Sequence, residues 1–147
     1  MNTEKKEIIV PGQLTGPALL TGYLIKEVSV APDRKRPAVI VCAGGGYWKR
    51  SDRESEPLAL QFMAMGCHAF ILDYSVAPNH FPTSVRELGE AVAYIREHAA
   101  EWKVDPAKII VCGSSAAGHL ACSLGVFWDN ELVYDAIGRT PAQIRPD

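Results

Sequence analysis

The sequence predicts an α/β fold with a mainly parallel sheet and flanking helices. From Val39 onward, short β-branched runs alternate with longer segments whose apolar residues recur every three or four positions. This alternation is typical of a parallel sheet covered by helices. Two runs of small residues, 44–46 and 113–118, each follow a predicted interior strand. Because reacting groups gather at the carboxyl ends of parallel strands, the two runs indicate one functional edge.

Length and composition exclude several classes of function. The 147 residues predict one domain, and a hydrophobic content of 48% can supply a sizeable core. A net charge of −2 provides no basic surface for nucleic acid, so no nucleic-acid partner is expected. No apolar run reaches the roughly 18 residues of a membrane span, and the polar start lacks a signal peptide's apolar stretch. We therefore expect no membrane contact and a cytoplasmic location, which suits four free cysteines without zinc spacing.

Three strands are expected before the first helix. Residues 8–10 predict a short strand that ends at a Pro-Gly pair, and residues 23–30 predict a longer one. The charged, proline-bounded segment 31–37 predicts a surface turn. Residues 38–42 form a continuous apolar, β-branched run, which predicts an interior strand buried on both faces.

The middle of the chain predicts helix, strand and helix. Pro57 suits the first turn of a helix, and Gly66 suits the position just after its end. Residues 67–73 predict the next strand, and 104–107 a turn. Between them, apolar residues at helical spacing predict one long helix with a core-facing stripe: Val85, Leu88, Val92, Ile95, Ala99 and Trp102.

Residues 109–121 pass from an apolar strand through small residues into a segment with helix propensity. A nucleophile elbow has this setting: its serine lies on a strained strand-to-helix turn, with small residues two positions before and after. Ser115 has Gly113 and Ala117 at these positions, whereas Ser114 fits the pattern less well. The sequence therefore predicts Ser115 as a nucleophile.

The region after the elbow is expected to be mainly helical and irregular. The elbow helix is expected to extend to about Trp128. A short helix over 131–137 and a further helical turn from Thr140 follow.

The elbow residues allow two other interpretations. Gly113 and Gly118 have the spacing of a phosphate-binding loop, but that motif needs Lys and Ser/Thr where this chain has His119 and Leu120. An ordinary strand-to-helix turn would use the small residues only for packing. The glycine run at 44–46 favours the functional interpretation, because it exposes backbone N–H groups at a second strand end.

Four segments together resemble the α/β-hydrolase esterases, and within them the acetyl xylan esterase and feruloyl esterase-like branch. These segments are Ala43–Tyr47, Arg53–Pro57, Asp73–Pro78 and Gly113–Leu120. The resemblance runs from about Ile25 to the C-terminus and implies serine-dependent hydrolysis of short acyl or sugar esters, such as acetylated xylan. The implied partner is a small-molecule ester, with no metal and no other cofactor.

The resemblance also implies roles for backbone groups. The N–H groups of Gly45, Gly46 and Ala116 would form an oxyanion hole. Tyr47 and Trp48 would either line the substrate pocket or simply pack against the fold. In one departure from the family pattern, Ala117 stands where the G-x-S-x-G motif ends in glycine.

The catalytic acid and histidine of such an esterase follow the serine, on later strands. After Ser115 the only histidine is His119, and the expected later strands are missing. We therefore expect an incomplete α/β-hydrolase fold, a single C-terminally truncated domain over 1–147 without its triad acid and histidine. His119, His80 or a partner chain remain alternatives for the base, and a non-catalytic fragment or binding module is the alternative function. An elbow strand left at the sheet edge is expected to self-associate.

Overall fold

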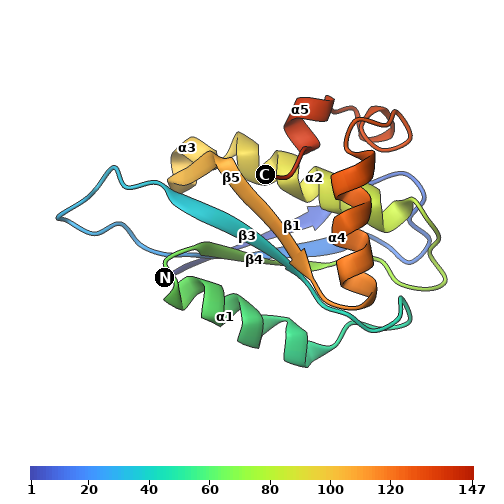
Figure 1. Ribbon diagram of the computed structural model, residues 1–147, viewed down its shortest axis with the longest axis horizontal. Helices are drawn as coiled ribbons and strands as arrows, with labels where there is room; N and C mark the ends of the chain where they lie inside the picture. The colour runs from blue at the N-terminus through green and yellow to red at the C-terminus, as the bar shows by residue number, and fades with distance from the viewer.

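A computed structural model describes all of residues 1–147 and contains one five-stranded sheet (Figure 1). Its strand order is β1-β2-β4-β3-β5. Strand β3 pairs in parallel with both β4 and β5, whereas β1 and β2 join the other edge through antiparallel pairs. The strands are β1 Asn2–Ile8, β2 Ala18–Leu24, β3 Arg36–Cys42, β4 His68–Asp73 and β5 Val104–Gly113.

Helices cover both faces of the sheet, as the alternation predicts. Helix α1 lies on one face, and the remaining helices lie on the other (Figure 1). They are α1 Glu56–Ala64, α2 Thr83–Glu97, α3 Ala99–Trp102, α4 Ala116–Phe127 and α5 Pro141–Ile144, with short 3₁₀ turns at Asp52–Glu54 and Asp135–Ile137. No helix is both long and apolar enough to cross a membrane.

The two faces of the sheet bury different residues of the same strands. Alternate residues of β3 point to opposite faces, so Ile40 joins the large core under α2 and α4, and Val41 joins the small core under α1. Both side chains are fully buried, which confirms the prediction of an interior strand.

Two predictions at the N-terminus were wrong. The first strand is the polar segment Asn2–Ile8, in which every residue except Ile8 is exposed. This strand is held at the sheet edge by its backbone pairing with β2 and buries almost no side chains. Its sequence therefore lacks the apolar pattern from which a strand is predicted. Strand β2 ends at Leu24, although residues 23–30 were predicted to be extended.

Two boundaries in the second half also differ from prediction. Residues 104–107, for which a turn is predicted, belong to β5. Val104 pairs with Arg36 and Ile109 pairs with Ala38, so the residues between Val104 and Ile109 form an irregularity in the strand. The predicted long helix is divided at His98 into α2 and α3, and α3 ends at the left-handed residue Lys103. Residues 131–137, for which a short helix is predicted, contain only the 3₁₀ turn Asp135–Ile137.

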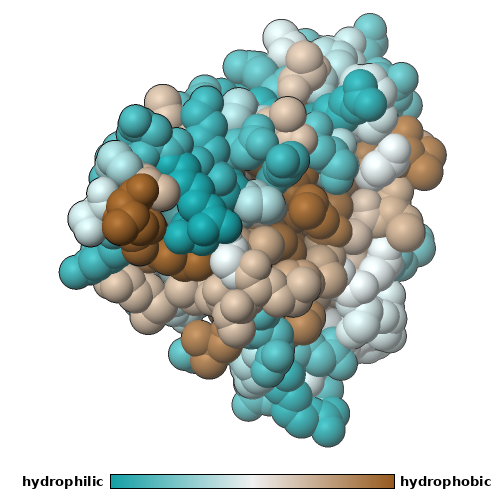
Figure 2. Space-filling view, turned by 60° about the vertical axis from the view of Figure 1, so that its left-hand side comes forward, coloured by the Kyte–Doolittle hydropathy of each residue, from teal (hydrophilic) through white to brown (hydrophobic).

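Strand β5 lies at the sheet edge, as predicted for the elbow strand. Asp147 bonds to its outer side, where the peptide N–H donates to the carbonyl of Ile109 and the carboxylate accepts from the Ile109 N–H. The Arg96 side chain also donates to the carbonyl of Pro106 in this strand. Ile110 is 39% exposed. In one view of the surface, apolar residues lie in a belt across the middle, with hydrophilic regions above and below it (Figure 2).

Self-association through this edge remains a prediction. Replacing Ile110 with lysine is expected to lower the concentration-dependent association of the chain, since a charge on an exposed edge strand opposes pairing with a second copy. Sedimentation over a range of concentrations measures it. Val30→Lys is the control, because Val30 is a highly exposed aliphatic residue outside the edge strand. A monodisperse wild-type monomer would contradict the prediction.

Candidate active site

The glycine run and the elbow lie at the same end of the sheet. The run follows β3 and the elbow follows β5, and the two strands are parallel neighbours (Figure 1). A Cβ atom built on Gly44 would lie 3.3 Å from the Cβ of Ser115 and 2.7 Å from the carbonyl oxygen of Ser114. The two segments are therefore in direct contact, although about 70 residues separate them.

Ser115 is exposed and has a strained backbone. Its φ of 52° and ψ of −124° lie outside the regions that a serine normally occupies. The residue stands between the end of β5 and the first residue of α4. Such strain persists only where the surroundings impose it, and it is concentrated at functional sites.

Close packing of the helix against the strand explains the small residues around Ser115. A Cβ atom on Gly113 would lie 2.5 Å from the backbone carbon and oxygen of Ala117. The backbones of β5 and α4 therefore touch at this point, which leaves no space for a side chain. The strand–turn–helix context that the sequence predicts is confirmed.

The glycine run forms a tight loop. Gly45 has a φ of 151°, and a Cβ there would lie 2.1 Å from the carbonyl oxygen of Lys49. The Gly45 carbonyl accepts hydrogen bonds from the N–H groups of Trp48 and Lys49, and the Gly44 carbonyl accepts one from Ser51. The loop is therefore closed by its own backbone, and only glycine fits at its second position.

The backbone N–H groups around Ser115 differ in their partners. The N–H of Gly44 donates to Glu54 Oε2 at 2.8 Å. Those of Gly45 and Gly46 donate to no protein acceptor. The N–H of Ala116 begins helix α4 and has no acceptor within the helix. Three donors at this end of the sheet are therefore free for a ligand.

Tyr47 links the glycine loop to the elbow helix. Its hydroxyl lies 2.9 Å from Nδ1 of His119, and its carbonyl accepts the N–H of Ala77 at 2.7 Å. Its φ of 59° is left-handed. The ring packs edge-on against Tyr74, and burial raises the pKa of the Tyr47 hydroxyl.

A pocket of about 220 Å³ adjoins this link. Tyr47 lines it, whereas Trp48 is 80% exposed and lies outside it. The structure therefore brings only one of the two predicted pocket residues to the site. No charged carboxylate, lysine or arginine lines the pocket; its residues are Tyr47, Ser75, Asn79, His80, Phe81, Ser84, Val85, His119 and Ser123.

The four histidines occupy different places. His119 and His80 line the pocket beside Tyr47, and Nδ1 of His119 is engaged by Tyr47. His98 packs between the rings of Tyr94 and Trp102. None of the histidines bonds to the Ser115 hydroxyl.

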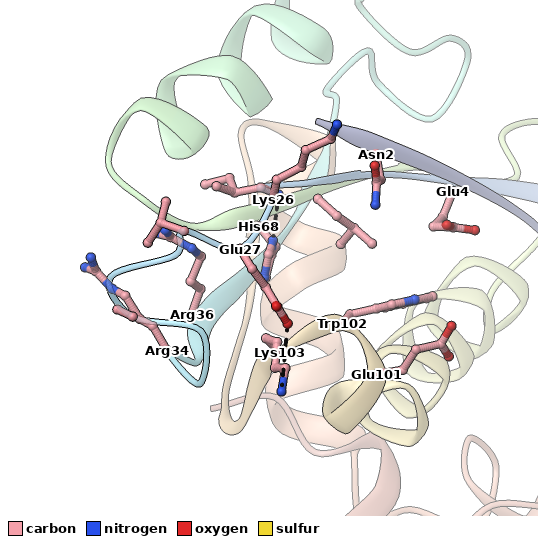
Figure 3. Close-up of a pocket in the computed structure, with 14 residues that line it drawn as sticks. Asn2, Glu4, Lys26, Glu27, Arg34, Arg36, His68, Glu101, Trp102 and Lys103 are labelled. Atoms are coloured by element: carbon pink, nitrogen blue, oxygen red, sulfur yellow. Dashed lines mark hydrogen bonds and ion pairs between the residues drawn. The ribbon is translucent and has the colours of Figure 1, made fainter.

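His68 lies at the opposite end of the sheet, in a pocket of about 560 Å³ (Figure 3). Its Nδ1 accepts the N–H of Ile25 at 3.1 Å, and burial together with Arg36 lowers its pKa. A neutral His68 thus anchors the chain after β2. The nearby ion pair between Glu27 and Lys103 spans 3.8 Å. This pocket contains no serine or cysteine nucleophile, and it is remote from the elbow.

Glu54 is a site residue that sequence reasoning missed. Its Oε2 atom accepts both the Gly44 N–H and, at 2.6 Å, the hydroxyl of Ser114. Neither periodicity nor spacing connects residue 54 with these positions. Its place in the 53–57 segment, which resembles a family motif, was the only available signal.

The strand order, the strained serine between β5 and α4 and the adjoining glycine loop define the class of the α/β hydrolases. The chain belongs to the BD-FAE family, which its sequence matches over residues 28–143. It is 33% identical over 103 residues to endo-1,4-beta-xylanase B from Butyrivibrio fibrisolvens, a match that covers 67% of this chain.

Two solved structures are similar in both sequence and fold. The acetyl ester-xyloside bifunctional hydrolase from Caldicellulosiruptor lactoaceticus is 32% identical, with a TM-score of 0.75 over 91% of this chain. The carboxylesterase Cest-2923 from Lactobacillus plantarum is 30% identical, with a TM-score of 0.78 over 90%. The chain spans 47% and 49% of these proteins and 16% of the xylanase. The α/β-hydrolase prediction is therefore confirmed for the part of the fold that this chain covers.

Proposed function

We propose that this chain supplies the nucleophile and oxyanion hole of a serine-dependent carboxylic ester hydrolase. The observation that carries the proposal is the strained Ser115 beside a glycine loop in which the N–H groups of Gly45 and Gly46 donate to no protein acceptor. Similarity to an acetyl ester-xyloside hydrolase and a carboxylesterase supports the same chemistry.

In the proposed reaction, the Ser115 hydroxyl attacks the ester carbonyl while a base takes its proton. The ester C–O bond then breaks, the alcohol leaves with that proton, and water attacks the acyl-serine to release the acid and restore Ser115. The N–H groups of Gly45, Gly46 and Ala116 stabilise the negative charge that develops on the carbonyl oxygen. Losing one such donor typically costs about 2.7–4 kcal/mol of transition-state stabilisation. The N-terminus of α4 adds positive potential at the same place.

No histidine or carboxylate of this chain hydrogen-bonds to the Ser115 hydroxyl, and His119 meets Ser115 only through its backbone N–H, which donates to the Ser115 carbonyl. His119 and His80 line the pocket beside Tyr47, but Tyr47 already engages His119 Nδ1, and His80 is an exposed loop residue. We propose that a histidine and an acid outside these 147 residues complete the reaction.

The proposed substrates are esters of short acyl groups or sugars. The pocket beside Tyr47 is small and contains no carboxylate, lysine or arginine, which suits a neutral ester better than a charged one. The acetyl ester named for the Caldicellulosiruptor relative supports this class.

A fluorophosphonate is expected to label the wild-type chain slowly at Ser115, at the residual rate that the oxyanion donors support without the missing base, and Ser115→Ala is expected to abolish this labelling. Mass spectrometry of the tryptic peptide locates the adduct. Ser29→Ala removes an exposed serine away from the elbow and is expected to leave the labelling of Ser115 unchanged. Hydrolysis of a short-chain nitrophenyl ester, compared with Ser115→Ala, tests whether a base is also present.

The alternative function is a binding module without catalysis. Equal, background labelling of wild type and Ser115→Ala in folded samples would favour that alternative. Loss of ester hydrolysis in His80→Ala or His119→Ala, but not in both, would instead assign the base to that residue.

A further inference from the structure

One carboxylate oxygen joins the two halves of the candidate site. Oε2 of Glu54 accepts the N–H of Gly44 at 2.8 Å and the hydroxyl of Ser114 at 2.6 Å. Gly44 belongs to the glycine loop after β3, and Ser114 immediately precedes the strained Ser115 after β5. Glu54 therefore connects the proposed oxyanion donors to the proposed nucleophile.

The contact is strengthened by a fully charged acceptor. Both partners are donors, and a charged acceptor forms stronger hydrogen bonds than a neutral one. The Ser114 hydroxyl and the Gly44 N–H lower the pKa of Glu54, which keeps the carboxylate ionised at neutral pH. A Cβ on Gly44 would lie 2.9 Å from Oε2, so a glycine is needed for this approach.

Glu54 is itself held by the loop that it binds. Its backbone N–H donates to the carbonyl of Ser51, and the Ser51 N–H donates to the carbonyl of Gly44. The carboxylate then returns to the Gly44 N–H. These bonds form a closed ring, which fixes the direction of the Gly44 peptide and leaves the next two N–H groups of the loop unpaired.

We propose that Glu54 is a positioning residue, which holds the glycine loop against the nucleophile elbow so that the N–H groups of Gly45 and Gly46 face the reacting oxyanion. This inference rests on the proposed function of Ser115. Glu54 acts through Gly44 and Ser114 and does not contact the substrate. Without its carboxylate, the loop keeps its glycines but loses its attachment to the elbow.

The test measures how fast Ser115 reacts with a fluorophosphonate, whose adduct carries an oxyanion-like oxygen. The serine oxygen forms a bond to phosphorus, the bond from phosphorus to fluorine breaks, fluoride leaves and the serine proton goes to base or buffer. In Glu54→Gln, we expect the maximal labelling rate to fall about 10- to 100-fold, with little change in the probe concentration at half-maximal rate. Glu54→Asp is expected to recover part of the rate.

Two further variants control the experiment. Glu56→Gln removes a carboxylate two residues away that bonds to neither loop, and its labelling rate is expected to equal wild type. Ser114→Ala removes the hydroxyl that donates to Glu54 Oε2 and leaves Glu54 itself in place. This variant is expected to be labelled more slowly than wild type. If Glu54→Gln fails to fold, Ser114→Ala and Glu54→Asp still test the inference.

A second measurement separates positioning from general damage. In ¹⁵N-labelled protein, the Gly44 amide proton is expected to shift upfield in Glu54→Gln, while resonances of β1 and β2 stay in place. The role of Glu54 would be overturned if Glu54→Gln is labelled as fast as wild type, or if it is labelled more slowly while the Gly44 resonance does not move. In either case, labelling of Ser115 in wild type would still support the proposed function. Absence of labelling in wild type would instead overturn the proposed function, and the positioning role with it.

Discussion

Replacing Gly113 with alanine is expected to abolish fluorophosphonate labelling of Ser115. The added Cβ would lie 2.5 Å from backbone atoms of Ala117, a distance at which something must move. Neither a strand nor a helix backbone yields easily, so α4 must shift away from β5 and carry the Ser115 turn with it. A displacement of about 1 Å at a reacting group can cost roughly 100-fold in rate.

The same substitution is expected to lower the free energy of unfolding by about 1–3 kcal/mol, because overpacking forces backbone shifts. Labelling kinetics and urea denaturation measure the two effects. Gly125→Ala is the matched control: Gly125 also lies in this region of the chain, within α4, and a Cβ there meets no atom within 4 Å. If Gly113→Ala reacts as fast as Gly125→Ala, the contact between strand and helix does not hold the serine.

Removing the carboxylate of Glu87 is expected to cause the largest loss of stability. Glu87 on α2 is fully buried and accepts hydrogen bonds from the N–H and hydroxyl of Ser75 and from the amide of Gln13. In Glu87→Ala these three donors lose their acceptor. Each buried donor left unpaired costs about 1–3 kcal/mol, a large part of the typical 5–15 kcal/mol of a domain.

The pH dependence of stability gives a second test of Glu87. Burial raises the pKa of its carboxyl above the ordinary 4.5, despite the opposing hydrogen bonds from Gln13 and Ser75. The folded state therefore holds this proton more tightly than the unfolded state. Its stabilising contribution is complete below the unfolded pKa and is lost as pH rises through the folded pKa.

Urea denaturation at a series of pH values from below 4.5 upward measures both effects. Glu87→Gln, which cannot ionise, is expected to lose the decline in stability that wild type shows above pH 4.5. Glu131→Ala removes an exposed carboxylate and serves as the control for net charge. Identical pH profiles for wild type and Glu87→Gln would show that burial of this group has no energetic consequence.

The interior of the fold could be predicted from sequence because its signal is local. Strand β3 is a continuous apolar run, and α1 carries proline near its start and glycine just after its end. Strand β1 could not be predicted, since its exposed polar side chains contribute nothing to a core and only its pairing with β2 makes it a strand. The beginning of β5 could not be predicted for a similar reason. Its residues have the composition of a turn, and only the pairing of Val104 with Arg36, before a register shift, makes them part of the strand.

The candidate site divides in the same way. Steric rules within the elbow identify Ser115, because they concern residues only two positions apart. The contact of Glu54 with Ser114 spans 60 residues, and that of Tyr47 with His119 spans 72, so both depend on the assembled sheet. Trp48, predicted either to line the pocket or to pack against the fold, does neither and is 80% exposed, because its position depends on the folded loop.

The edge position of β5 has a consequence for local motion. The glycine loop extends from β3, which neighbouring strands protect on both sides, whereas Ser115 extends from a strand paired on one side only. Amide hydrogen exchange should therefore reveal a gradient, with slow exchange in β3 and frequent opening along the outer side of β5 beyond Ile109. The Ser115 turn after β5 would then leave its native position more often than the glycine loop after β3. The opening rate of β5 would therefore limit how long Ser115 and the glycine loop stay aligned.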